Sequence, residues 1–211
     1  GVVEKDLRIN PGQDVFLRGK NLYDAAQSSV DLQSRRKLYL RAASIFVTYI
    51  NENPGNANVE AAWYYCGSSY YQAGEKVDAQ RCFSTLLNRF GQGKWAAAAA
   101  YTLAADHYNQ REYAFAAPLF ERYAGSAPRP EDKPKGFLFA GNCYRLLGRH
   151  REAIGAYKKV VTDPAGAIYR NQAHLAIGHM TFKAGKLQEA LDIFEEIAKS
   201  RATAKYRGEA A

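Results

Sequence analysis

The chain of 211 residues carries 29 basic and 21 acidic side chains, a formal net charge of +8, and 47% of its residues are hydrophobic. No apolar run approaches the roughly 18 residues that a membrane-spanning helix needs, so the sequence predicts no membrane span. The chain has only three cysteines, and such a small, odd number does not suit a scaffold held together by disulfide bonds. The composition is therefore that of a folded domain with an ordinary apolar core.

An alanine followed four residues later by an aromatic ring recurs five times at a step of 37 residues. The alanines are Ala42, Ala79, Ala116, Ala153 and Ala190, the rings are Phe46, Phe83, Phe120, Tyr157 and Phe194, and a further core-type residue follows at Tyr49, Leu86, Tyr123, Val160 and Ile197. A fixed period of this size predicts stacked repeats rather than a closed globule. It also disfavours an enzyme, because each repeat mainly buries its neighbour.

The chain begins with residues 1–13, which we expect to be an extended lead-in because Pro11-Gly12 interrupts the segment. Asp14 is then a candidate N-cap for the first helix. A helical solenoid is expected over residues 14–211. Its repeats begin near Tyr23, Glu60, Ala97, Pro134 and Asn171.

Each repeat reads as two antiparallel helices. Residues are numbered from the start of each repeat, which puts the recurring alanine at position 20. A small residue at position 8, such as Gly67, lets the two backbones approach, and the aromatic ring at position 24 fills the space beside the crossing. Glycine at position 15 suits the left-handed turn that ends the first helix. Prolines at Pro54, Pro128 and Pro164 are expected to stop the second helix. The pattern predicts ten or eleven helices and no substantial sheet.

The series Trp63, Gly67, Tyr70, Ala79 and Phe83 resembles a tetratricopeptide repeat, and the same phase covers residues 23–211. The resemblance implies an all-α, right-handed α-α superhelix of about five helix-turn-helix repeats. The common repeat has about 34 residues, so the additional residues are expected between repeats.

Two repeats depart from the pattern. The first has Ala26 and Val30 at positions 4 and 8, which makes it the poorest match. The third has Ala100 and Ala104 there, and its Pro118 fits only if the second helix starts late and Pro118 lies in the first turn.

A sixth repeat is expected to begin at Gly208, after a second helix over residues 187–199. The apolar face around Ile193 and Ile197 would then be uncovered, which predicts weak self-association of the chain through this end. The alternative is a short solvating helix that closes the array.

The tetratricopeptide resemblance implies that the first helices line a concave groove. The partner-binding residues expected there are Tyr64, Tyr65, Tyr71, Tyr101, Tyr108, Phe139, Asn142, Arg145, His179 and Lys183. Tyrosine offers apolar area with a polar tip, which suits a peptide-binding wall. The alternative is that several of these rings pack on the neighbouring repeat.

Charge is concentrated in residues 133–211, with 14 basic and 7 acidic side chains. Part of it, including Arg151 and Lys158, is assigned to ordinary solvated surface. The groove should be basic toward this end and should bind a protein or peptide that is apolar with acidic flanks. Nucleic acid is disfavoured as a partner, because no Arg-rich tract or recognised module is present.

No catalytic residue, metal site or cofactor is expected. His174 and His179 are five residues apart, so they lie on different faces of one helix and do not suit joint metal ligation. His107 and His174 take core positions. Cys66, Cys82 and Cys143 are expected to be buried free thiols; a bridge between Cys66 and Cys82 remains open.

The chain is thus interpreted as a non-catalytic protein–protein interaction scaffold. Its long repeat resembles bacterial envelope proteins of the β-barrel-assembly lipoprotein and Tol-Pal coordination protein type, which implies the periplasm or cell envelope. The alternatives are a cytoplasmic tetratricopeptide domain of a larger enzyme or regulator, and an RNA-associated helical repeat.

Overall fold

The computed structural model describes residues 11–127 and 129–209. These residues form ten α-helices and one short 3₁₀ helix, and they contain no β-strand. The prediction of an all-α chain with ten or eleven helices is confirmed. Within the described residues, no helix combines the length and hydropathy needed to cross a bilayer.

The backbone divides into two compact parts, Gly1–Ala99 and Ala100–Ala211. Helices of the N-terminal part are α1 (Pro11–Ser28), α2 (Leu32–Glu52), α3 (Val59–Gln72) and α4 (Lys76–Arg89), and α5 (Lys94–Asn109) contains the division. Consecutive helices pack on each other from α1 to α4. They enclose one apolar core that includes Phe46, Tyr49 and Cys66.

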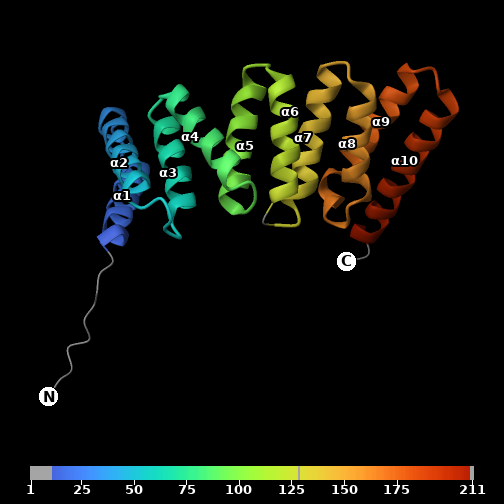
Figure 1. The fold of residues 1–211 in the computed structure, drawn as a ribbon. Helices are drawn as coiled ribbons and strands as arrows, with labels where there is room; N and C mark the ends of the chain where they lie inside the picture. The colour runs from blue at the N-terminus through green and yellow to red at the C-terminus, as the bar shows by residue number, and fades with distance from the viewer. Residues whose placement is uncertain (1–10, 128, 210–211) are drawn as a thin grey trace. The chain divides into compact units, whose positions relative to one another are not determined.

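The C-terminal part continues the same alternation of helices (Figure 1). It contains α6 (Tyr113–Ser126), α7 (Asp132–Leu146), α8 (His150–Thr162), the 3₁₀ helix η1 (Pro164–Gly166), α9 (Ala167–Lys183) and α10 (Leu187–Glu209). Each helix from α6 to α10 packs on the next. Their core includes Phe120, Tyr157 and Val160.

The register of the 37-residue repeat is confirmed by burial. All five alanines of the pattern are at most 1% exposed, and the rings Phe46, Phe83, Phe120 and Tyr157 are at most 2% exposed. The fifth ring, Phe194, is half-buried. The same sequence phase therefore meets the same packing environment in successive helix pairs.

Close approach at the helix crossings of the second and fourth repeats requires glycine. A Cβ atom on Gly67 would lie 2.7 Å from the ring of Phe83, and one on Gly141 would lie 2.7 Å from the ring of Tyr157. Such distances are far below van der Waals contact. The small residue at position 8 and the ring at position 24 thus form one interlocked pair, as the sequence predicted.

The turns within the helix pairs also repeat. Gly74, Gly148 and Gly185 have φ angles of +85°, +72° and +78°. In each turn the backbone N–H of the residue after the glycine donates a hydrogen bond to a carbonyl of the preceding helix. The N–H of Glu75, for example, donates to the carbonyl of Tyr70 at 2.9 Å. This is a Schellman C-cap, which favours glycine at the left-handed residue.

Arg111 occupies the same left-handed position in the third repeat, with φ +62°. A side chain with a Cβ atom costs roughly 1–2 kcal/mol in this conformation, whereas glycine adopts it freely. We expect Arg111→Gly to stabilise the protein by about 0.5–1 kcal/mol. Urea unfolding of the two proteins measures this difference, and an unchanged or lowered midpoint would contradict it.

The first repeat differs from its prediction. Helix α1 begins at Pro11, so Asp14 lies in its first turn and is not the N-cap. The small residue that meets Phe46 is Gly19, whose Cβ atom would lie 2.8 Å from the ring, while Val30 is 90% exposed in the turn. The first crossing is therefore built eleven residues earlier than the sequence phase indicated. Residues 1–10 of the expected lead-in lie outside the described residues.

Pro118 does not lie in the first turn of a late helix, as predicted; it is the sixth residue of α6. Because proline has no backbone N–H, the carbonyl of Ala114, four residues earlier, lacks its usual helical hydrogen-bond donor. Both residues are exposed, so water can satisfy that carbonyl. Pro54 follows the end of α2, and Pro164 begins η1 after Asp163, the residue that follows α8. Pro128 lies outside the described residues.

The C-terminal end also differs from its prediction. Helix α10 runs through Gly208 to Glu209, so no new helix starts at Gly208. Ile197 is only 4% exposed, and Ile193 is half-buried, so the expected uncovered face around them is wrong. Among the side chains of this helix that the structure describes, the exposed large apolar ones are Leu187 and Leu191 instead.

Candidate functional site

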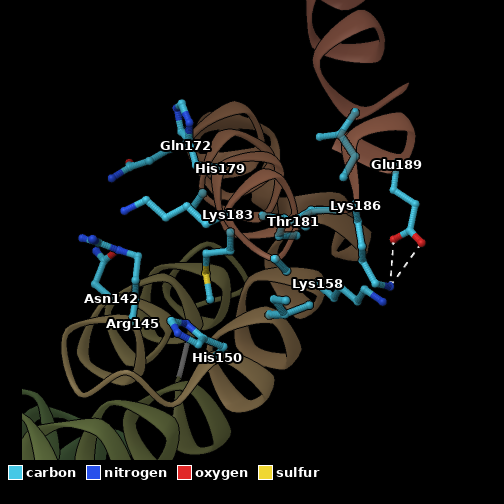
Figure 2. A pocket seen from close by; sticks show the side chains of 16 residues that line it. Asn142, Arg145, His150, Lys158, Gln172, His179, Thr181, Lys183, Lys186 and Glu189 are labelled. Atoms are coloured by element: carbon cyan, nitrogen blue, oxygen red, sulfur yellow. Dashed lines mark hydrogen bonds and ion pairs between the residues drawn. The ribbon is translucent and has the colours of Figure 1, made fainter. Parts of the chain in front are cut away.

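A cleft of about 920 Å³ opens between the last four helices of the C-terminal part (Figure 2). Its wall and floor are formed by Asn142, Arg145, His150, Ile154, Lys158, Gln172, Ala176, Ile177, His179, Met180, Thr181, Lys183, Ala184, Lys186, Glu189 and Ile193. We call this feature the basic cleft, because Glu189 is its one acidic residue against four lysines and arginines. Pockets for compact ligands span roughly 300–1,000 Å³, so the basic cleft can take several side chains of a partner.

The repeat positions the polar wall of the basic cleft. Asn142 and His179 directly follow Gly141 and Gly178, the glycines at the helix crossings, and occupy equivalent positions in successive repeats. Arg145 is three residues after Asn142, and residues at that spacing share a helix face. Figure 2 shows Asn142 and Arg145 on α7 and His179 on α9 at one side of the basic cleft.

Asn142 is held by a hydrogen bond from the second helix of its own repeat. The Tyr157 hydroxyl donates to Oδ1 of Asn142 at 2.8 Å. With its oxygen engaged in this way, the amide presents its NH₂ group as a donor. Asn142 is half-buried, so this donor is available at the wall of the basic cleft.

The cations of the basic cleft are unevenly compensated. Lys186 pairs with Glu189, with 3.1 Å between Nζ and Oε1. No carboxylate of the described residues lies within ion-pair distance of Arg145, Lys158 or Lys183. All three are exposed. The basic cleft therefore carries positive charge that no carboxylate of the described residues compensates at ion-pair distance.

The floor of the basic cleft is apolar. Ile177 and Met180 of α9 are 7% and 8% exposed, and half-buried Ile154, Ala176 and Ile193 extend the floor toward α8 and α10. Two further apolar side chains adjoin the cations in sequence: Leu146 is 45% exposed and Phe182 is 56% exposed. The arrangement can receive apolar and anionic groups of one ligand together.

Four of the ten residues predicted to bind a partner line this cleft: Asn142, Arg145, His179 and Lys183. Tyr101, Tyr108 and Phe139 belong to the same part of the chain but do not line it. Their rings pack on the core, and Phe139 stacks on Phe120 with 5.1 Å between the ring centroids. Tyr101 lies 5.0 Å from Tyr123 and is covered on one face by the ammonium of Lys135 at 4.6 Å.

The other three predicted residues lie on α3 in the N-terminal part. Tyr65 stacks on Phe46 at 5.5 Å and carries the ammonium of Lys20 over its ring at 4.5 Å. The ring of Tyr64 lies 5.0 Å from that of Trp95 in a tilted arrangement, and burial raises the pKa of its hydroxyl. Tyr71 is half-buried. For Tyr64 and Tyr65 the alternative of packing between neighbouring helices is therefore realised in large part.

The sequence prediction did not include the contribution of the second helices and turns. His150, Ile154 and Lys158 of α8 and Lys186 before α10 line the basic cleft. Lys158 is exposed, in agreement with its assignment to solvated surface, and it also lines the basic cleft, which was not predicted from the sequence. A signal was present in the excess of cations over residues 133–211, but it did not distinguish these lysines from their neighbours.

His107 and the three cysteines, for which no catalytic or metal-binding role was expected, lie in ordinary structural environments. His107 is half-buried, and its Nδ1 lies 2.6 Å from Oε2 of Glu112. Within residues 11–127 and 129–209, no group of three or more His, Cys, Asp or Glu residues could hold a metal ion. The three cysteines are buried and free, as predicted.

Comparison with known proteins gives a short family match and a long structural match. The tetratricopeptide repeat family model matches residues 140–164, which run from α7 to the proline after α8. No curated protein matches the sequence. A structure titled "Crystal structure of MamA protein" superposes with a TM-score of 0.62 at 19% identity, covering 92% of this chain and 96% of that one.

Two further structures agree. "MamA 41-end from Desulfovibrio magneticus RS-1" gives a TM-score of 0.54 at 18% identity and covers 88% of this chain and 96% of that one. "Crystal structure of MamA" gives a TM-score of 0.55 at 20% identity and covers 84% of this chain and 99% of that one. At such identity the likeness concerns the fold alone. The chain has the fold of a tetratricopeptide-like helical repeat solenoid.

Proposed function

We propose that this chain is a non-catalytic interaction scaffold whose basic cleft binds an acidic, partly apolar segment of a partner protein. The observation that carries the proposal is the set of three cations, Arg145, Lys158 and Lys183, which lack carboxylate partners among the described residues and surround an apolar floor. Helical repeat folds commonly present such surfaces to other proteins. That general tendency supports a protein partner.

The shape of the basic cleft favours a polypeptide over a small molecule. Its cationic side chains are exposed rather than enclosed, and the exposed apolar residues Leu146 and Phe182 are the sequence neighbours of Arg145 and Lys183. A segment that alternates leucine-like and carboxylate side chains would contact both kinds of group. Because the cations are exposed, they should mainly raise the association rate and the salt sensitivity of binding.

A binding role is also favoured over catalysis by the residues present. Thr181 carries the one hydroxyl among the lining residues, and it is buried; Glu189, the one carboxylate, is paired with Lys186. This set offers no nucleophile next to a base. The alternatives of a cytoplasmic domain within a larger enzyme or regulator and of an RNA-associated repeat remain rival proposals.

Short fluorescent peptides test the proposal. We expect a helical peptide of leucine and glutamate to bind in fluorescence anisotropy, with affinity that falls as salt is raised. Twins with glutamine or lysine in place of glutamate should bind at least about 10-fold more weakly. Equal binding of the three peptides would contradict an acidic partner. Tighter binding of an RNA oligonucleotide than of the acidic peptide would favour the RNA-associated alternative.

A location in the bacterial periplasm or cell envelope is part of the same proposal and is supported by the sequence resemblance alone. Fractionation of cells that express the full-length gene product tests it. Recovery with periplasmic markers is the expected result, and recovery with cytoplasmic markers would favour the cytoplasmic alternative.

A further inference from the structure

Cys66 of α3 and Cys82 of α4 face each other inside the second repeat. Their Sγ atoms are 3.3 Å apart, and the Cys82 thiol donates to the sulfur of Cys66. Cys66 is fully buried, and Cys82 is 4% exposed. Both are free, so the pair is a dithiol enclosed between two helices.

The fold already brings the two sulfurs close to bonding range. A disulfide bond is about 2.05 Å long, so the sulfurs need to approach by a little over 1 Å. The residues are 16 apart in sequence, and the tight turn at Gly74 holds their helices side by side. Bond formation therefore needs only small side-chain and helix adjustments.

The hydrogen bonds make the two thiols unequal. The Cys66 thiol donates to the carbonyl of Ala43 in α2, with 3.9 Å between sulfur and oxygen. When Cys82 loses its proton, the Cys66 S–H can turn to it, and this hydrogen bond with the nearby charge of Arg81 lowers the pKa of Cys82. The same contact, together with burial, raises the pKa of Cys66. Cys82 is therefore the nucleophile of the pair, because thiolate is the reactive form.

We infer that Cys66 and Cys82 are a site of reversible two-electron oxidation by small-molecule disulfides. Because Cys82 is buried in the closed repeat, the reaction proceeds through a local opening of α4 that admits the oxidant. The Cys82 thiolate then attacks one sulfur of the oxidant and releases one thiol, which leaves a mixed disulfide. The Cys66 sulfur then displaces the second thiol and loses its proton. One S–S bond forms between the helices, the S–S bond of the oxidant is cleaved, and two small thiols carry away the electrons and protons.

Oxidation would covalently join the two helices of the second repeat. Helix α3 carries Tyr64 and Tyr65, whose rings contact Trp95 and Phe46, so the bond would tether this aromatic cluster to α4. A cross-link that closes a loop stabilises mainly by restricting the unfolded chain. The oxidised protein should therefore unfold several degrees higher than the reduced one.

Folded, reduced protein incubated with oxidised glutathione tests the inference. The expected result is loss of two of the three thiols, counted with maleimide after denaturation, and a mass lower by two hydrogen atoms. Peptide mapping should place the bond between Cys66 and Cys82, and a reducing agent should restore all three thiols. Three unreacted thiols, a stable glutathione adduct, or a bond formed only in denaturant would overturn the inference.

Cys143 provides the matched control. It is a buried free thiol like Cys66, and burial raises its pKa to about 12. Cys143→Ser should oxidise like the wild type and lose both of its thiols. Cys66→Ser and Cys82→Ser should each fail to form an internal bond. An internal bond that involves Cys143, or one between two chains, would likewise contradict the assigned site.

Discussion

Replacing Phe120 by alanine is expected to lower the free energy of unfolding by about 3–5 kcal/mol. The ring is 2% exposed in the middle of the core of the C-terminal part and stacks on Phe139 at 5.1 Å. It also meets the edges of Tyr101 and Tyr108 at 6.1 and 6.2 Å. Its removal leaves a cavity that these rings can fill only in part. Urea unfolding followed by circular dichroism measures the loss.

The same helix offers a matched control. Phe115 is 63% exposed, one and a half turns before Phe120 on α6. Phe115→Ala should change the free energy of unfolding by less than about 1 kcal/mol, because little apolar area leaves the core. Equal losses for the two variants would show that the burial pattern, and with it the 37-residue register, is wrong.

Introducing leucine at Gly141 is expected to cost about 1–3 kcal/mol or more. The first added carbon alone would lie 2.7 Å from two atoms of the Tyr157 ring, which is fully buried and cannot move aside. A larger side chain must push α7 away from α8. Because Asn142 is bonded to the same tyrosine, this variant should also weaken binding of the acidic peptide.

Gly155 of α8 gives the control for this substitution. A Cβ atom there meets nothing within 4 Å, and the residue is exposed within a helix. Gly155→Leu should stabilise the protein by up to about 1 kcal/mol, since leucine favours the helix more than glycine does. If Gly141→Leu were tolerated as well as Gly155→Leu, close crossing at the glycine would not hold the helix pair together.

Much of the fold was predictable because the repeat places equivalent residues in equivalent surroundings. The alanine at position 20 and the ring at position 24 are buried in four consecutive repeats, so a one-dimensional pattern was enough to locate the core. The helix crossing of the first repeat could not be predicted in this way. Its crossing uses Gly19, and a longer connection to Phe46 removes the fixed spacing on which the pattern depends.

The basic cleft was predictable only in part. Asn142, Arg145, His179 and Lys183 followed from the tetratricopeptide resemblance, which implies that the first helices of the repeats line a groove, and they line the basic cleft. The part formed by His150 and Lys158 depends on how one helix pair packs against the next, and exposed lysines carry no periodic signal of that packing. The position of Pro118 inside α6 was not predictable for a similar reason. Whether a helix tolerates an internal proline depends on the exposure of the proline and of the carbonyl that loses its donor, and this exposure is set by the packing of the helices.

Charge reversal in the basic cleft tests the central claim most directly. Arg145→Glu with Lys183→Glu should weaken binding of the leucine–glutamate peptide at least about 10-fold and confer binding of the lysine twin. Arg151→Glu with Arg201→Glu changes the net charge equally at exposed residues that do not line the basic cleft, and it should leave the preference for the acidic peptide intact. Equal losses in the two double variants, with no gain for the lysine peptide, would show that net charge rather than the basic cleft selects the partner.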